Sequence, residues 1–288
     1  MVKSSYLSNV LLKGYCSYGI GGPAKFLVVA HSKDELMSHL LEAKKLNQKT
    51  IVIGKGSNCL FDDRGFDGLV IINRIQEIFW RNNQVIAGAG YSFSLLGIQA
   101  SKKGYAGLEF ASGIPGSVGG AVFMNAGAGK SETKDVLLEV EFLHENGETE
   151  VIKIDNLNFS YRMSPFQKMK GAILSATFKL TEDSNAKAFQ EKLLAYRLET
   201  QPYKDKSCGC VFRNPEGDSA GRIIDSLGLK GLLIGGAKIS ETHANFFVNK
   251  DEAKASDILD LIAHVQLKAK ENNINLEPEV WYIPFDDN

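Results

Sequence analysis

The sequence predicts an α+β protein built from two or three compact units. Its first part has a buried strand at 26–30, a helix and a second buried strand at 50–54, which is typical of a βαβ layer. Further on, the turn residues Asn146 and Gly147 lie between two apolar runs, which is typical of an antiparallel hairpin. A chain of 288 residues is long enough for more than one hydrophobic core.

Each expected element has its own signal. Ser32 and Glu35 form a capping box that opens the first helix, and Gly104 ends a short helix at 92–103. The polar run at 181–185 marks the main boundary. More helices are expected at 219–227, around 258–265, and at 186–199 with Phe189, Leu193 and Tyr196 on one face. More strands are expected at 68–73, 84–90, 137–143, 151–154, 172–180, 246–248 and 276–283.

Composition and charge exclude several classes of function. The hydrophobic share of 44% and charged share of 23% are ordinary for a soluble globular protein. A formal net charge of −1 gives no electrostatic basis for binding nucleic acid or a membrane. Residues 1–6 lack the apolar core of a secretion signal, and no apolar run could cross a bilayer, so we expect a cytoplasmic protein. The four cysteines form no CxxC pair, so we expect neither a disulfide framework nor a metal site.

The glycine-rich stretch at 107–129 is the strongest functional signal. Gly113, Gly116, Gly119 and Gly120 recur there, and Pro115 stiffens the chain between them. Glycine lets backbone N–H groups approach an anion without a Cβ in the way, so the stretch could cradle phosphate oxygens. A set of tight turns between strands explains the same glycines equally well.

Two familiar nucleotide-binding motifs are not present. The sequence Gly129-Lys130-Ser131 matches the end of a P-loop, but Met124 stands where that motif needs its first glycine. The loops that start at Gly54 and Gly88 each lack the third glycine of a dinucleotide fingerprint. A P-loop NTPase and an ordinary Rossmann domain are therefore both disfavoured.

Residues with catalytic or binding chemistry are scattered along the chain. The loop at 54–58 leaves the carboxyl end of a strand in the βαβ layer, which is a usual ligand position, although a plain turn is also possible. Arg162 lies among apolar and aromatic neighbours and could be either an anion-binding residue or half of a structural ion pair. Four other candidates each have an equally plain structural explanation: Cys210, His243, Asn245 and Glu279.

Taken together, the motifs resemble the UDP-N-acetylenolpyruvoylglucosamine reductases of peptidoglycan synthesis, the MurB family. The resemblance extends over nearly the whole chain, and this number of motifs in register makes coincidence improbable. They lie at 19–24, 54–58, 107–110, 113–121, 124–127, 161–162, 209–215, 220–221, 228–231, 243–245 and 276–280.

The resemblance implies an FAD-binding domain of the vanillyl-alcohol-oxidase (PCMH) type at 1–185, with subdomains at about 1–73 and 74–185. A C-terminal α+β substrate-binding domain at 186–288 would follow. FAD would be bound without covalent attachment by two loops, whose residues are Gly54, Lys55, Gly56, Ser57 and Asn58, and Ile114, Pro115, Gly116, Ser117, Val118, Gly119 and Gly120.

The resemblance also implies the reaction and the residues that carry it. NADPH would reduce FAD, and N5 of the flavin would then deliver hydride to C3 of the enolpyruvyl ether of UDP-N-acetylglucosamine. Arg162 and Glu279 would stabilise the enolate-like charge, and Cys210 would donate a proton to C2. Asn214, His243 and Asn245 are implied as substrate-binding residues.

Two departures from the family pattern and two rival functions stay open. After Gly127 the sequence runs Ala128-Gly129-Lys130-Ser131, where relatives usually have an aromatic residue and two glycines. The stretch between Arg162 and Cys210 is short, which resembles the compact second subtype of the family. The rivals are another FAD oxidoreductase on the same scaffold and a flavin-binding protein without catalysis.

Overall fold

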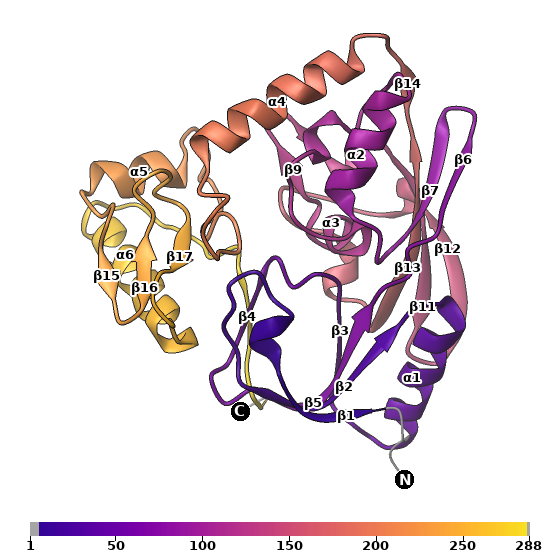
Figure 1. The fold of residues 1–288 in the computed structure, drawn as a ribbon, viewed down its shortest axis with the longest axis horizontal. Coiled ribbons are helices and arrows are strands. Elements are labelled where there is room, and N and C mark those ends of the chain that lie inside the picture. The colour runs from indigo at the N-terminus through magenta and orange to yellow at the C-terminus, as the bar shows by residue number, and fades with distance from the viewer. Residues whose placement is uncertain (1–5, 287–288) are drawn as a thin grey trace. The chain divides into compact units, whose positions relative to one another are not determined.

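The computed structural model of the chain describes residues 6–286 and divides them into two compact units (Figure 1). The first unit comprises residues 27–55 and 68–197, and the second comprises 6–26, 56–67 and 198–286. The start of the chain, predicted to carry no secretion signal, lies outside the described residues except for Tyr6. None of the helices within 6–286 is both long enough and apolar enough to cross a membrane.

The chain passes between the two units several times. Strands β2 (Pro23–Ala30) and β5 (Phe66–Asn73) each begin in the second unit and end in the first. The predicted domain boundary near residue 185 stays a prediction. The structure shows in addition that residues 6–26 and 56–67 pack with the C-terminal third of the chain.

The first unit is built on a five-stranded sheet whose neighbouring strands are all antiparallel. The predicted hairpin around Asn146 and Gly147 is confirmed, because its two strands pair in register from Glu139 opposite Lys153 to Leu143 opposite Thr149. The strands in sheet order are β12 (Thr149–Lys153), β11 (Leu137–His144), β13 (Gly171–Lys179), β7 (Gln84–Gly88) and β6 (Ile78–Arg81).

Two helices cover one face of this sheet, α2 (Phe93–Lys102) and α3 (Val118–Met124) (Figure 1). Phe93 is fully buried between them and the sheet, with its ring centroid 5.9 Å from that of Phe110. The helix α3 was not expected, because glycine pairs usually indicate turns. Gly119 nevertheless lies inside this helix. A glycine is needed there because an added Cβ would come within 2.8 Å of the Ala89 side chain.

The strands and the helix of the predicted βαβ layer are present, but its two strands, β2 and β3 (Thr50–Ile53), are separated in the sheet by β5. Strand β3 pairs with β5 in parallel, within a four-stranded sheet of order β1-β2-β5-β3 in which β1 is Leu7–Leu11. Helix α1 (Lys33–Lys45) begins as the sequence predicts, because the Ser32 hydroxyl accepts the Glu35 N–H at 3.2 Å. The Glu35 carboxylate accepts the N–H of His31, one residue before the position that a capping box requires.

Helix α4 (Ala186–Thr200) forms where the sequence predicts it, and two of the three apolar residues expected on one face are exposed. Phe189 is 53% exposed and Tyr196 is 64% exposed, whereas Ala186 and Gln190 are buried. The helix packs through these two residues, so its apolar stripe faces away from the core.

The short strands of the first unit form two pairs, β8 (Tyr105–Ala106) with β14 (Thr181–Glu182), and β9 (Gly127–Ala128) with β10 (Ser131–Glu132).

The second unit contains a small antiparallel sheet and two helices. The predicted stripe of helix α6 (Ala255–Glu271) is confirmed, since all four of its apolar residues are buried: Ile258, Leu261, Ile262 and Val265. The other elements of this unit are β15 (Leu233–Ile234), β16 (Ala237–Ile239), β17 (Phe247–Asn249) and α5 (Ala220–Ser226).

The last strand is shorter than predicted. Only β18 (Trp281–Ile283) of the expected strand at 276–283 is regular, and it pairs in parallel with β4 (Cys59–Phe61). Pro278 has no N–H to contribute to a ladder and forms only an isolated bridge opposite Phe212. The predicted strand is therefore divided into two differently paired parts.

Candidate active site

The two glycine-rich loops come together in the first unit. Ser117 is the N-cap of α3, and its hydroxyl accepts the Gly120 N–H at 3.3 Å. Gly54, at the end of β3, lies directly against this serine, because an added Cβ would stand 2.0 Å from the Ser117 oxygen. A glycine at position 54 is therefore required for the two loops to touch.

These loops present backbone N–H groups that have no acceptor within residues 6–286. They belong to Gly116 and Ser117, and to all five residues of the loop at 54–58. The other donors of the central loop are used internally, since the Ile114, Val118, Gly119 and Gly120 N–H groups donate to Ala111, Tyr91, Ala89 and Ser117. Fewer N–H groups are therefore available to an anion than the predicted stretch at 114–120 contains.

Two cations lie beside the same loop in the first unit. The Arg74 guanidinium donates to the Gly54 carbonyl at 2.8 Å, and the Lys55 ammonium donates to the Ser92 hydroxyl at 3.0 Å. Burial, together with the nearby Arg74 charge, lowers the pKa of Lys55. A pair of like charges this close favours an anionic ligand between or beside them.

Sequence reasoning missed Arg74, although a signal was available. Strands β3 and β5 are parallel neighbours, with Ile53 opposite Ile72, and the loops after them start at Gly54 and Arg74. Because parallel strands end at the same edge of a sheet, both residues belong to the edge where ligands bind.

Arg162 is held in a strained backbone conformation in the first unit. Its φ is +58°, which few residues other than glycine adopt. The guanidinium donates to the Gly127 carbonyl at 3.0 Å and lies 4.8 Å from the centre of the Tyr161 ring. These protein contacts orient the charged group. Strain of this kind is common at functional sites, where the surrounding structure maintains it.

Asn125 holds the segment that carries Arg162, and sequence reasoning gave it no role. Its side chain is fully buried, and the amide nitrogen donates to the Ser160 carbonyl at 2.9 Å and to the Glu132 carboxylate at 3.1 Å. The departure from the family pattern lies next to it, where Gly129 has a φ of +65° in the turn between β9 and β10. The altered residues thus form a tight hairpin.

In the second unit, Cys210 and Glu279 lie on adjacent extended segments. The Glu279 N–H donates to the Val211 carbonyl at 2.7 Å, and the Arg213 N–H donates to the Glu277 carbonyl at 2.9 Å. Glu279 is therefore directly opposite Val211, the residue after Cys210. Both side chains are half-buried. The structure thus places the backbones of two of the three predicted catalytic residues on neighbouring segments.

Asn58 joins the glycine loop to the Glu279 segment. Its side-chain amide donates to the Glu279 carbonyl at 3.0 Å, and its own carbonyl accepts the Trp281 N–H at 3.0 Å. In the same loop Gly56 has a φ of +61° and passes so close to Tyr15 that a Cβ would stand 2.2 Å from the Tyr15 carbonyl oxygen.

The other three thiols of the second unit are perturbed by burial. Burial raises the pKa of Cys16 and Cys208, and raises that of Cys59 to about 12. Cys208 is 5% exposed and its sulfur donates to the Cys59 carbonyl at 3.3 Å. Thiols whose pKa is raised in this way form little thiolate and react slowly as nucleophiles.

The three predicted substrate-binding residues have different surroundings. Asn214 is exposed, and its side-chain oxygen accepts the Ala220 N–H at 3.0 Å near the start of α5. The Nδ1 atom of His243 accepts the Asn245 N–H at 3.3 Å, and burial lowers the pKa of this histidine. Asn245 is 1% exposed, with both polar atoms of its side chain bonded to the main chain of Phe212.

Comparison with known proteins identifies the family of this chain. The chain is 50% identical over 291 residues to a UDP-N-acetylenolpyruvoylglucosamine reductase of Protochlamydia amoebophila, covering 100% of this chain and 97% of the relative. It is 49% identical to the reductase of the same name from Chlamydia abortus, covering 96% and 94% of the two chains. This chain belongs to the UDP-N-acetylenolpyruvoylglucosamine reductase family.

Further matches agree with membership of the UDP-N-acetylenolpyruvoylglucosamine reductase family. The family models "FAD binding domain" and "UDP-N-acetylenolpyruvoylglucosamine reductase, C-terminal domain" match residues 24–153 and 201–283. The crystal structure of the reductase (MurB) from Thermus caldophilus superposes with a TM-score of 0.82 at 38% identity, covering 96% of this chain and 98% of that one. The predicted resemblance and the predicted fold class are both confirmed.

The observed loops fit the FAD that this reductase family uses. Unpaired N–H groups and two cations suit the negative oxygens of a diphosphate, and Gly54 leaves the space that a side chain would fill. Within the first unit, the residues that would hold the group are Gly54, Lys55, Gly116 and Ser117.

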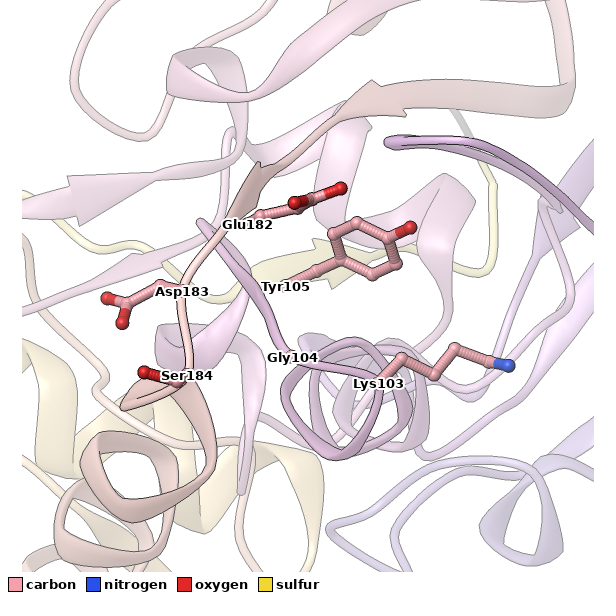
Figure 2. Close-up of a pocket in the computed structure, with 6 residues that line it drawn as sticks. All are labelled: Lys103, Gly104, Tyr105, Glu182, Asp183 and Ser184. Carbon is pink, nitrogen blue, oxygen red and sulfur yellow. The ribbon is translucent and has the colours of Figure 1, made fainter.

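One surface pocket, of about 340 Å³, does not belong to this set of residues. It is lined by Lys103, Gly104, Tyr105, Glu182, Asp183 and Ser184, none of which the family motifs include. Figure 2 shows the Asp183 carboxylate and the Lys103 ammonium pointing in opposite directions. These charged groups do not converge on a common ligand. Within residues 6–286 no cluster of three or more metal-ligating side chains is placed to hold an ion.

Proposed function

We propose that this protein reduces the enolpyruvyl ether of UDP-N-acetylglucosamine to UDP-N-acetylmuramate, with NADPH as the reductant and FAD as the bound cofactor. Its partners are then these small molecules, and the product enters peptidoglycan precursor synthesis. We place the reaction in the cytoplasm. The free thiols Cys16, Cys59, Cys208 and Cys210 support that placement, because unpaired cysteines are usual in a reducing compartment.

One observation carries the proposal. Asn58, in the loop proposed for the cofactor, donates to the carbonyl of Glu279 at 3.0 Å, and Glu279 in turn donates to the residue after Cys210. The loop proposed for the cofactor, the backbone of Glu279 and the backbone next to Cys210 are thereby connected by consecutive hydrogen bonds within one unit. A protein that merely stores flavin has no need of this connection.

Charge stabilisation is the role that we assign to Arg162. When bound, FAD supplies the hydride-transfer chemistry between NADPH and C3 of the enolpyruvyl group. As hydride reaches C3, negative charge accumulates on C2 and the adjoining carboxylate of the substrate. The planar guanidinium of Arg162 can form two parallel hydrogen bonds to such a carboxylate, and fixed contacts to Gly127 and Tyr161 orient it in advance.

Proton delivery is the role that we assign to Cys210. A thiol is a stronger acid than a serine hydroxyl by several pKa units, so Cys210 can give its proton to C2 and regain one from solvent. Glu279 sits opposite the neighbouring Val211 and, in its protonated form, donates a hydrogen bond to the substrate, while Asn214 and His243 contribute to substrate binding.

Anaerobic spectroscopy tests the proposal. The purified protein should show a flavin absorption band that NADPH bleaches, and the enolpyruvyl sugar should restore it with formation of one equivalent of UDP-N-acetylmuramate. A flavin that NADPH bleaches but the sugar leaves reduced would point to another oxidoreductase. A flavin that NADPH leaves unchanged would point to a non-catalytic flavoprotein.

A further inference from the structure

Asn245 makes an unusual set of contacts in the second unit. Its side chain is 1% exposed, and its Oδ1 atom accepts the Phe212 N–H at 2.9 Å while its Nδ2 atom donates to the Phe212 carbonyl at 2.8 Å. Its main-chain carbonyl accepts the Val211 N–H at 2.8 Å. One residue therefore satisfies three backbone groups directly after Cys210.

These contacts continue a ladder that backbone pairing alone cannot complete. Cys210 forms a bridge with Phe246 and the Val211 N–H donates to the Asn245 carbonyl, so the next partner in the ladder would be a peptide group bonded to the N–H and carbonyl of Phe212. The carboxamide of Asn245 takes that place, since it carries an acceptor and a donor on one plane as a peptide group does. On the opposite side, the Glu279 N–H donates to Val211 at 2.7 Å. Cys210 thus precedes two residues that are fixed from both sides.

We propose that Asn245 is a positioning residue for Cys210, in place of the direct substrate contact that the family motif suggested. The inference rests on the proposed function, because it assumes that Cys210 gives a proton to the substrate. Removing the carboxamide leaves a buried donor and a buried acceptor on Phe212 without partners, and the segment that carries the thiol must shift to satisfy them. A displacement of about 1 Å at a proton donor slows a reaction by about 100-fold.

The experiment compares Asn245→Ala and Asn245→Asp with the wild-type holoenzyme in the two half-reactions. For Asn245→Ala, oxidation of the reduced enzyme by the enolpyruvyl sugar should slow by about 100-fold. Reduction of the flavin by NADPH should stay within about twofold of wild type, because that step does not use the Cys210 proton. A fall of equal size in both half-reactions would overturn the proposal.

Asn245→Asp adds a readout that a purely structural role would not move. An ionised carboxylate can accept from the Phe212 N–H but repels the Phe212 carbonyl, whereas a protonated one can donate to it. Burial favours the protonated form. The rate of sugar reduction by the variant, divided by the wild-type rate, should therefore rise as the pH is lowered from about 8 to about 6. A ratio that does not change with pH would contradict the positioning role.

Asn249 provides the matched control in the same unit. It makes the same two kinds of contact, since its Nδ2 atom donates to Tyr18 at 2.9 Å and its Oδ1 atom accepts the Ala253 N–H at 2.8 Å. Asn249→Asp should lower thermal stability by a similar amount and leave the ratio of the two half-reaction rates at its wild-type value. A change in that ratio as large as the one for Asn245→Asp would overturn the proposal.

Hydrogen exchange gives a test that does not depend on turnover. In Asn245→Ala the peptide covering residues 209–213 should exchange its amide protons faster than in wild type, and iodoacetamide should alkylate Cys210 at a changed rate. Unchanged exchange and unchanged alkylation would exclude the role. Should wild-type protein fail to oxidise with the sugar, the proposed function itself is wrong, and exchange still reports whether Asn245 fixes the segment.

Discussion

Gly54 and Ser117 lie in direct contact, so close that a single added methyl group at residue 54 would stand 2.0 Å from the serine oxygen. The contact joins the end of strand β3 to the N-cap of helix α3, two features separated by more than sixty positions in the sequence. At this contact, two loops with unpaired N–H groups lie side by side in the first unit.

Gly54→Ala should weaken cofactor binding. The new Cβ must push Ser117 and the start of α3 away, so we expect a loss of stability of about 1 to 3 kcal/mol and a lower ratio of flavin to protein after purification. Thermal unfolding and the visible absorption spectrum measure the two effects. Ser117→Gly in the same chain removes the obstacle and should restore part of both.

Gly14→Ala is the control for that change. No atom lies within 4 Å of the Cβ position at Gly14, and its φ is not in the left-handed region. Its flavin content should therefore equal that of wild type. If Gly54→Ala also kept full flavin content, the contact with Ser117 would have no bearing on the cofactor.

Cys210→Ala should separate the two half-reactions. Flavin reduction by NADPH should persist, whereas oxidation by the sugar should fall by at least about 100-fold, because no acid is then placed to protonate C2. Cys210→Ser should keep part of the activity, since a hydroxyl can donate but is the weaker acid. Stopped-flow absorbance follows both steps. Cys208→Ala is the control, and a loss in that variant equal to the loss in Cys210→Ala would contradict the assignment.

Arg162→Lys should slow sugar reduction by about 100-fold or more, although the charge is kept. An ammonium is a point charge and cannot reproduce the planar pair of hydrogen bonds to a carboxylate. Single-turnover kinetics with the reduced enzyme measures the effect. Arg81→Lys, at an exposed position in the same unit, should behave as wild type. Turnover close to wild type in Arg162→Lys would remove this residue from the mechanism.

Asp62 should make stability depend on pH. Its carboxylate accepts three hydrogen bonds from Arg64, one from the main-chain N–H at 2.8 Å and two from the guanidinium at 3.0 and 2.9 Å, and one from the Tyr282 hydroxyl at 2.7 Å. The bonds from Arg64 are the main cause that lowers the pKa of Asp62 below its ordinary value. A lowered pKa stabilises the folded state above the unfolded pKa of about 3.9, and that stabilisation is lost as the pH falls below it.

Asp62→Asn tests this linkage. The difference in unfolding free energy between wild type and Asp62→Asn should be largest near neutral pH and should shrink as the solution is acidified below about pH 4. Asp67→Asn serves for comparison, because the Lys25–Asp67 pair is largely exposed and contributes little. A difference for Asp62→Asn that stays constant from neutral to acid would show that the group does not titrate as described.

Local signals in the sequence predicted the elements well, while burial and long-range contacts were predicted less well. Ser32, Ser92 and Ser219 cap helices where the patterns placed them, because capping depends on neighbouring residues. The burial of α4 could not be predicted, since periodicity shows which residues share a face and not whether another element covers that face. Helix α3 was missed because Gly119 is required by the close approach of Ala89, a residue from another segment, and not by a turn.

The sequence by itself determined the family, the fold class and the residue types available for chemistry, since motifs in register and helix and strand periodicities are all written along the chain. Only the tertiary structure decided what each residue touches. Asn58 and Glu279 are 221 positions apart, and Arg74 meets Gly54 only because two parallel strands end at one edge. Hydrogen bonds form between groups that folding brings within about 3 Å, and a linear pattern carries no record of which distant groups those will be.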